Sequence, residues 1–228
     1  RASMANTSDL PAGAVPDAYG DLVNLLDQQG YSVEAADDSA REILQSVAAK
    51  TGSVTASGNS DAILSAEASS RFGYSVAPAG DVNGDGYADV IVGAYQYSSS
   101  VGRAYIFYGG SDGITSKSAT AADVILTGES GFLLGFSVSS AGDVNGDGYA
   151  EVIVGSYEST GRAWIFYGGS NMVSKSSTAA DVILTGEASS RLGYSVSSAG
   201  DVNGDGYSDV IVGAPIHNSS TGRAYIFY

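Results

Sequence analysis

One nine-residue pattern of oxygen-bearing side chains occurs three times in the sequence, beginning at Asp81, Asp143 and Asp201. It reads Asp-x-Asn-x-Asp-Gly-x-x-Asp, with Glu in the last place of the second copy, so side-chain oxygens stand at positions 1, 3, 5 and 9. The glycine at position 6 permits the sharp bend that closes such a loop. Ca²⁺ takes about six to eight hard oxygen ligands at roughly 2.3–2.6 Å, whereas Mg²⁺ demands a tighter octahedron. The pattern therefore predicts three calcium loops.

The backbone carbonyl of position 7, a tyrosine in every copy, is expected to supply a fifth ligand, and water to complete the shell. The expected ligands are Asp81, Asn83, Asp85, Tyr87 and Asp89 in the first loop, Asp143, Asn145, Asp147, Tyr149 and Glu151 in the second, and Asp201, Asn203, Asp205, Tyr207 and Asp209 in the third. We expect one Ca²⁺ in each loop and three per chain. Because Glu151 has a longer side chain than Asp, the middle loop is expected to differ in affinity.

The charge within each loop also favours a bound cation. Three carboxylates within ~5 Å of one another repel by on the order of a few kcal/mol at an effective dielectric of about 20. The alternative interpretation is an Asn-Gly hairpin turn with solvated carboxylates. An acid at position 9 in all three loops favours the calcium interpretation.

The composition excludes several classes of partner and site. The 228 residues carry 10 Lys and Arg against 25 Asp and Glu, a formal net charge of −15, which argues against nucleic acid as a partner. The sequence has no Cys, which excludes thiolate zinc sites and Cys nucleophiles, and one His, His217, which we expect on an exposed loop. Neither a Gly-x-Ser-x-Gly elbow nor a phosphate-binding loop occurs, so we expect no enzymatic activity.

No stretch of the sequence predicts a membrane span. The longest apolar runs are five or six residues, far short of the roughly 20 that a spanning helix needs. The first residues do not resemble a signal peptide. Extracellular calcium-binding modules often bind Ca²⁺ weakly, because calcium is plentiful outside cells. We therefore expect an extracellular or cell-surface location for a protein with these loops.

The loops belong to a repeated unit of about 60 residues, since they recur at spacings of 62 and 58 residues. Apolar runs and period-two alternation predict four strands per unit. In the first unit these are 71–76, 89–94, 102–108 and 123–127; counterparts of its first and last strands are 134–138, 191–196 and 181–185. Four strands per tandem unit indicate the blades of an all-β propeller. The alternative is a plain β-sandwich with repeated hairpins, which is disfavoured because sandwiches do not repeat so faithfully.

The first 60 residues differ from the repeats. Helical spacing of apolar residues predicts two short helices, starting near Asp17 and near Asp38. The expected organisation is therefore a helical segment and linker over residues 1–60, and a three-blade propeller domain over residues 61–228.

Several motifs in the repeats resemble those of a known family. Phe72-Gly73, the 81–89 loop, Gly93-Ala94 and, in the third copy, 213–215 (Gly-Ala-Pro) resemble the FG-GAP repeats of integrin α-subunit heads. Leucine replaces the phenylalanine in the second and third copies, and the first two copies lack the proline. The resemblance covers roughly residues 61–228 and places the family's calcium ligands on the residues named above. It implies a non-enzymatic calcium-binding module for protein interaction or cell adhesion. The alternatives are a carbohydrate-binding lectin and a structural scaffold with no ligand other than calcium.

Three blades do not close a ring, because propellers typically need about four to eight. No copy of the 123–127 strand follows the last unit, whereas residues 61–65 (Asp-Ala-Ile-Leu-Ser) precede the first unit and match that strand. We therefore expect a homodimer of three plus three blades that exchanges residues 61–65 at both seams. The alternative is that the chain is a fragment of a longer protein with further blades.

Overall fold

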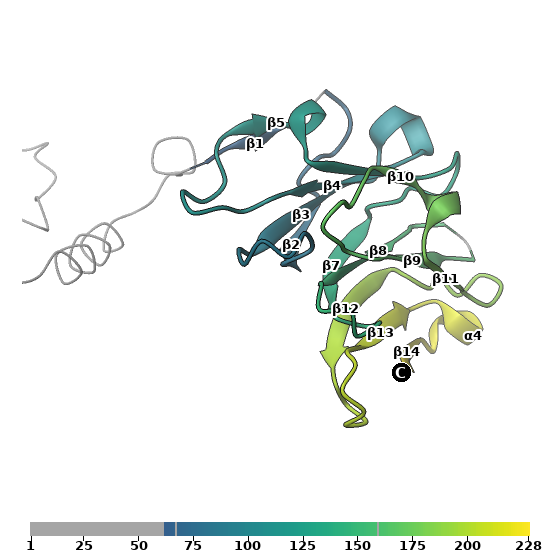
Figure 1. The fold of residues 1–228 in the computed structure, drawn as a ribbon. Helices are drawn as coiled ribbons and strands as arrows, with labels where there is room; N and C mark the ends of the chain where they lie inside the picture. Colours follow the sequence, from purple (N-terminus) through teal and green to yellow (C-terminus); the bar gives the residue numbers. More distant parts are fainter. Residues whose placement is uncertain (1–61, 67, 159) are drawn as a thin grey trace, which may run out of the picture. The chain divides into compact units, whose positions relative to one another are not determined.

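The computed structural model describes residues 62–66, 68–158 and 160–228 (Figure 1). These residues belong to one compact unit, Asp61–Tyr228. The two helices expected within residues 1–60 lie outside the described residues. The regular structure described is all-β apart from short turns of helix, and it has the blades of a propeller, as the sequence predicted.

Each repeat forms an antiparallel blade. Blade 1 consists of β2 (Ser75–Gly80), β3 (Asp89–Ala94), β4 (Arg103–Phe107) and β6 (Val124–Thr127). Blade 2 consists of β7 (Ser137–Gly142), β8 (Glu151–Gly155), β9 (Arg162–Phe166) and β11 (Val182–Thr185). Blade 3 has three strands among the described residues: β12 (Ser195–Gly200), β13 (Asp209–Ala214) and β14 (Arg223–Phe227).

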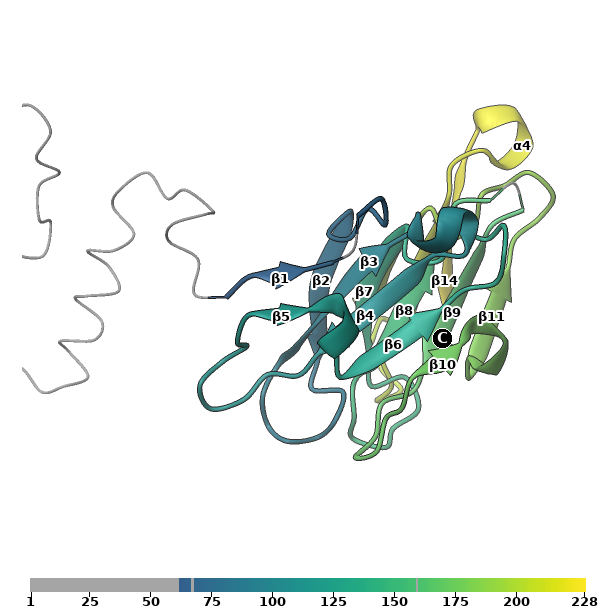
Figure 2. The same ribbon diagram turned by 90° about the horizontal axis from the view of Figure 1, so that it is seen from above.

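Short elements connect these strands. β10 (Lys175–Ser176) pairs in parallel with β6, so the blades are linked side by side at their outer strands (Figure 2). β1 (Leu64–Ser65) pairs in parallel with β5 (Lys117–Ser118) in the same way. The helical turns are η3 (Tyr97–Ser100), η4 (Ala119–Ala121), η5 (Ser177–Ala179) and α4 (His217–Ser220).

The first strand of each blade begins later than the sequence predicted. The expected strands at 71–76, 134–138 and 191–196 start instead at Ser75, Ser137 and Ser195. In blade 1, Arg71 (φ 56°) and Gly73 (φ 82°) adopt left-handed conformations, and the Tyr74 amide donates to the Arg71 carbonyl at 3.1 Å. The apolar residues that indicated a strand therefore lie in a turn. The remaining expected strands are confirmed to within one residue at each end, except that 61–65 is a strand only at Leu64–Ser65.

The hydrophobic core lies between successive blades, because each blade is apolar on both faces. Ile91 and Leu126 of blade 1 pack with Trp164 and Phe166 of blade 2, and all four side chains are buried. A second cluster joins Ile153 and other residues of blade 2 to blade 3. The first strands β2, β7 and β12 lie next to one another on one side of the row of blades (Figure 1).

Glycines allow the blades to approach closely. Tyr149 and Ala150 of blade 2 lie where a side chain on Gly84 or Gly80 of blade 1 would collide with them. The next junction repeats this arrangement, with Tyr207 and Ser208 of blade 3 against Gly146 and Gly142 of blade 2. We call the tyrosine and the residue after it the knobs, and the two glycines the notches. A backbone bond accompanies each junction, from Ala150 N to the Asp81 carbonyl (3.0 Å) and from Ser208 N to the Asp143 carbonyl (2.8 Å).

Candidate metal centres

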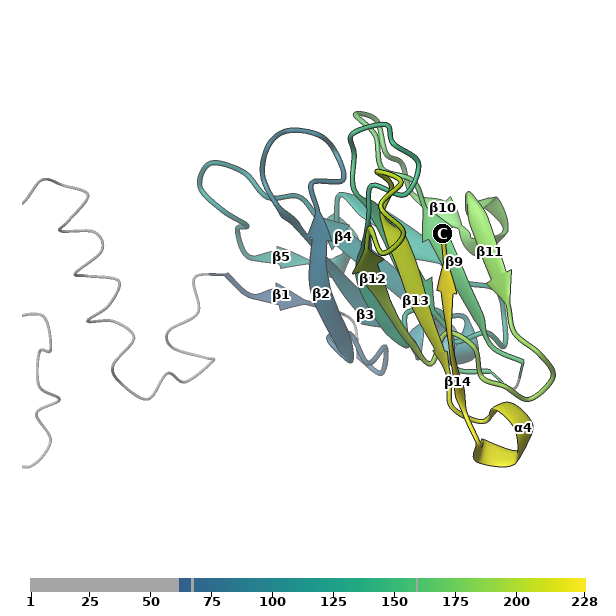
Figure 3. The same cartoon turned by 90° about the horizontal axis from the view of Figure 1, so that it is seen from below.

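The three acidic loops join the first strand of each blade to the second. Because every blade has the same topology, the loops lie at the same end of the sheets, as Figure 3 shows for those that follow β2 and β12. α4, in the loop between the second and third strands of blade 3, lies at the opposite end. The fifteen expected ligands are therefore placed in three equivalent loops on one side of the molecule.

The carboxylate at position 1 organises each loop. Asp81 Oδ1 accepts hydrogen bonds from the amides of Gly84 (2.7 Å) and Asp85 (3.1 Å), and Oδ2 accepts from Gly86 (2.9 Å). Gly84 and Gly86 have φ of 75° and 90°, left-handed values that favour glycine. Asp143 and Asp201 make the same three contacts in their loops. In each of the three loops, the backbone therefore wraps around the carboxylate at position 1.

Positions 3 and 5 are fixed against each other. Asn83 donates from Nδ2 to Asp85 Oδ2 at 2.8 Å and accepts the Asp85 amide at 3.0 Å, while Asp85 Oδ1 accepts the Tyr87 amide at 2.9 Å. The other two loops repeat these bonds within 0.2 Å. The oxygens needed for a cation are therefore held by local hydrogen bonds in one arrangement.

The acid at position 9 is buried and ties the loop to the blade. Asp89 accepts the Val82 amide at 2.9 Å and the Gly109 amide at 2.8 Å. Glu151 accepts the equivalent amides of Val144 (2.7 Å) and Gly168 (3.4 Å). Asp209 accepts the Val202 amide at 2.8 Å, and its buried Oδ1 has no hydrogen-bond partner among the described residues.

Burial and neighbouring charge disfavour the ionised forms of Glu151 and Asp89. The pKa of Glu151 is raised to about 7, mainly by burial and also by the charges of Asp147 and Asp143, while its two amide hydrogen bonds act in the opposite direction. Burial likewise raises the pKa of Asp89, with Asp85 and Asp81 adding to the effect. Among the described residues no ion pair neutralises any of the loop acids. A divalent cation would supply the missing positive charge.

The middle loop gathers its carboxylates most closely. Asp143, Asp147 and Glu151 each offer an oxygen within 4.8 Å of the others, a spacing suited to a shared metal ion. Within the residues that the structure describes, the first and third loops do not reach this spacing. The longer side chain of Glu151 accounts for the difference, since Asp stands at position 9 in those two loops. The donor set of all three loops, which is oxygen only, fits Ca²⁺.

Comparison with known proteins agrees with this geometry. A family model described as FG-GAP repeat matches residues 72–107, 134–166 and 192–227. The chain belongs to the FG-GAP repeat family. Each matched segment starts in the turn before the first strand of an FG-GAP blade and ends with its third strand.

The FG-GAP blades are also similar to integrin α subunits. Integrin alpha-6 of Gallus gallus is 34% identical over 151 residues, which is 64% of this chain and 13% of that protein. Integrin alpha-7 of Rattus norvegicus is 34% identical over 172 residues, 72% of this chain and 14% of that protein. Integrin alpha-IIb of Mus musculus is 42% identical over 88 residues, 38% of this chain and 8% of that protein. The chain therefore spans a small part of these relatives.

No helix in the described part of the chain is long and apolar enough to cross a membrane.

The tyrosine at position 7 of each FG-GAP loop has a second role that the sequence analysis missed. Its carbonyl was expected to bind the metal, but the ring of Tyr149 also packs on Gly84 in the loop of the preceding blade. Tyr207 packs on Gly146 in the same way. Each loop is thus supported by the next blade. A glycine stands at position 4 of every loop, although the metal pattern alone does not require one. This glycine is the sequence feature that could have indicated the packing of the tyrosine ring.

A row of aromatic side chains, also missed as a unit, lies at the other end of the FG-GAP blades. Phe136 is central, with ring centroids 4.7 Å from Tyr157, 5.0 Å from Tyr194, 5.1 Å from Tyr74 and 5.4 Å from Tyr95. We call these five residues the aromatic row. Tyr74 and Tyr194 are exposed. Tyr97, two residues after Tyr95, lies outside the row, and its ring centroid is 3.7 Å from the Arg103 guanidinium carbon.

The position of His217 differs from the exposed one that was expected from the sequence. Instead of lying exposed on its loop, its side chain is buried, with 8% of the residue accessible, and Nδ1 lies 3.2 Å from Glu187 Oε2. The short helix α4 turns the side chain inward, and Glu187 follows the last strand of blade 2, thirty positions earlier. A contact between segments so far apart along the chain could not be read from the loop sequence.

Proposed function

We propose that this chain is a calcium-stabilised FG-GAP propeller module that mediates protein interaction or adhesion outside the cell and has no catalytic activity. One observation carries the proposal: three loops of the same sequence pattern fold around their first carboxylate in the same way. Loops that served only as turns would not need three acids each in that arrangement. The similarity to integrin α subunits supports a role in adhesion.

The residues that would hold the cations are the fifteen ligands expected from the sequence. The carboxylates at positions 1, 5 and 9, the Asn side chain at position 3 and the tyrosine carbonyl at position 7 supply hard oxygens. The bound ion would offset the burial and the charge repulsion that together raise the pKa of Glu151 and Asp89. Its contribution is structural, because it binds the ordered loop and not the unfolded chain.

The aromatic row is the surface best suited to a protein partner. Tyr and Phe are enriched at protein interfaces, where a rigid ring supplies contact area at a low cost in conformational entropy. Exposed rings also stack against sugars, so glycan binding is the second candidate, favoured by Tyr74 and Tyr194. If the chain binds glycans on an array, and Tyr74→Ala and Tyr194→Ala each abolish that binding, the lectin alternative would be favoured over the protein-interaction role.

Calcium binding is tested by isothermal titration calorimetry on the chain and on single charge-removing variants. We expect three Ca²⁺ per chain, and Asp85→Asn, Asp147→Asn and Asp205→Asn each to weaken one site by about tenfold or more, since affinity in such loops follows ligand charge. Asn retains an oxygen that can accept the position-7 amide, so the variants remove charge with little change of shape. Asp112→Asn, at an exposed acid outside the loops, is the matched control and should bind three ions unchanged. A heat signal of zero at millimolar calcium would refute the metal assignment.

A further inference from the structure

The acidic loops of neighbouring blades are in direct contact with one another. The ring of Tyr149, at position 7 of the second loop, lies on Gly84, at position 4 of the first loop. The amide of that glycine donates to Asp81 Oδ1 at 2.7 Å. The amide of Ala150, the residue after the tyrosine, donates to the Asp81 carbonyl at 3.0 Å. Two consecutive residues of the second loop therefore support the residue around which the first loop folds.

The junction between the second and third loops repeats these contacts. The Tyr207 ring lies on Gly146, whose amide donates to Asp143 Oδ1 at 2.6 Å. The Ser208 amide donates to the Asp143 carbonyl at 2.8 Å. Both blades of each junction are among the described residues, so these contacts hold whatever number of blades the whole protein contains.

Hydrogen bonds also connect the buried position-9 acids of the first two loops. Asp89 accepts the amide of Val82 at 2.9 Å, and the Val82 carbonyl accepts the amide of Gly169 at 2.8 Å. The preceding residue, Gly168, donates its amide to Glu151, the position-9 acid of the second loop, at 3.4 Å. A short run of backbone groups thus leads from one expected ligand to its counterpart in the next loop.

Each of the two tyrosines serves two loops at once. The Tyr149 carbonyl is an expected ligand of the second loop, while its ring lies on Gly84 of the first loop. Once the carbonyl is held by an ion, the ring is held against that glycine as well. The first loop then has less freedom to lose when it takes up its own ion, and a smaller ordering cost means tighter binding.

We propose that the tyrosine at position 7 is a positioning residue for the calcium site of the preceding blade, and that it couples the ions of neighbouring loops. Such coupling presupposes the calcium binding proposed above. Tyr149 would raise the affinity of the first loop, and Tyr207 that of the second. Because coupling is reciprocal, an ion in either loop would favour binding in the other. Residues that hold metal ligands without touching the metal change its affinity by about 10- to 100-fold when they are replaced.

A calcium titration followed by nuclear magnetic resonance can measure each loop separately. In all three loops the amide of the position-6 glycine donates to the position-1 carboxylate, so its signal responds to the state of its own loop. The signals of Gly86, Gly148 and Gly206 therefore report the dissociation constants of the first, second and third loops.

Removal of a ring is expected to weaken the preceding loop. Tyr149→Ala should raise the dissociation constant of the first loop by about tenfold, and Tyr207→Ala should do the same to the second loop. Both variants keep the backbone carbonyl. Tyr149→Phe keeps the ring and should leave the affinity of the first loop at the parent value. A general loss of stability would weaken all three loops together, so the pattern across the loops identifies a positioning role.

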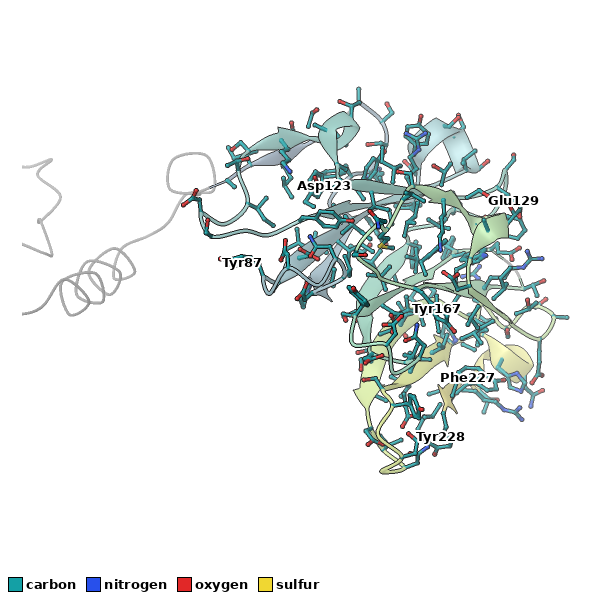
Figure 4. The ribbon with its side chains drawn as sticks, viewed as in Figure 1. Tyr87, Asp123, Glu129, Tyr167, Phe227 and Tyr228 are labelled. Atoms are coloured by element: carbon teal, nitrogen blue, oxygen red, sulfur yellow. The ribbon has the colours of Figure 1, made fainter. Side chains whose placement is uncertain are left out.

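Tyr87→Ala is the matched control at the same loop position. Tyr87 is exposed, and Figure 4 labels it at one end of the row of blades. This variant should leave the dissociation constants of the second and third loops unchanged. Unchanged affinity of the first loop in Tyr149→Ala would overturn the proposal, and so would weakening of the second and third loops in Tyr87→Ala.

Gly84→Ala tests the contact from the other side and does not depend on the folding of a Tyr149 variant. A methyl group on Gly84 would collide with the Tyr149 ring, so this variant should weaken the second loop by about fivefold as well as the first. Gly86 has a similar left-handed φ, but nothing lies within 4 Å of the position that a side chain on it would occupy. Gly86→Ala should leave the second loop unchanged. Equal effects of the two variants on the second loop would contradict coupling through the ring.

The coupling and the calcium binding fail in different ways. Calcium in all three loops, with no change of the first loop in Tyr149→Ala, would overturn the coupling and leave the metal loops intact. No change of any loop signal at millimolar calcium would overturn both.

Discussion

Chelation of calcium is expected to lower the melting temperature of the chain by tens of degrees. An ion that binds only the folded state stabilises it by about 2.7 kcal/mol per site when its free concentration is 100 times the dissociation constant, which amounts to about 8 kcal/mol for three independent sites. For a domain of this size, each kcal/mol shifts the melting temperature by about 2–4 °C. Loss of the ions would also leave three acids in each loop without a counter-charge. Differential scanning calorimetry in millimolar calcium and in excess EGTA measures the shift.

The control for this experiment is the triple variant Asp85→Asn/Asp147→Asn/Asp205→Asn. Each Asn retains its oxygen while one charge is removed from every loop, so EGTA should shift its melting temperature by only a few degrees. The variant should also be more stable than the chelated parent protein, because repulsion within each loop is reduced. Equal melting curves for the parent protein with and without EGTA would contradict structural calcium.

Replacing Gly135 by Ala is expected to destabilise the chain by about 3 kcal/mol or more. A methyl group there would collide with the carbonyl oxygen of Arg103 in β4, at the junction of blades 1 and 2, where the backbone cannot give way easily. In addition, Gly135 has a φ of 86°, a left-handed value that costs an alanine about 1–2 kcal/mol. Urea denaturation in saturating calcium measures the change in the free energy of unfolding.

Gly131→Ala separates the two causes. Gly131 lies four residues earlier and has a similar φ of 93°, but nothing lies within 4 Å of the position that its side chain would occupy. This variant should therefore lose only about 1–2 kcal/mol, the cost of the backbone conformation alone. Equal losses in the two variants would contradict the close approach of the blades at Gly135.

The sequence predicted the parts of the fold that depend on local pattern. The run at Asp89–Ala94 could be assigned to a strand because a short, continuous apolar run is typical of a strand that is buried on both faces. The loops could be assigned because oxygen donors at alternate positions, closed by a glycine, match the ligand requirements of Ca²⁺ directly. Both assignments needed only the residues within one repeat.

The features that the sequence did not reveal depend on neighbouring repeats. The residues before Ser75 look like a strand, yet they form a turn whose Gly73 amide donates to the Gly93 carbonyl at 3.0 Å. The ring of Tyr149 lies on Gly84 across the junction of two blades, a contact that no single repeat specifies. The aromatic row likewise takes residues from all three blades. The recurring motifs indicated that the units repeat, but not which side chains come into contact where two units join.

The two junctions between blades use the same parts. Ser75 donates from Oγ to the Gly135 carbonyl at 3.0 Å, and Ser137 donates to the Gly193 carbonyl at 2.7 Å. Both junctions also have the same arrangement of knobs and notches, which begins at the other end of the first strand. A gene that gains or loses one whole unit would therefore create no new kind of interface. Evolution of such a chain could therefore change the number of units by duplication or deletion, while every junction keeps the same contacts.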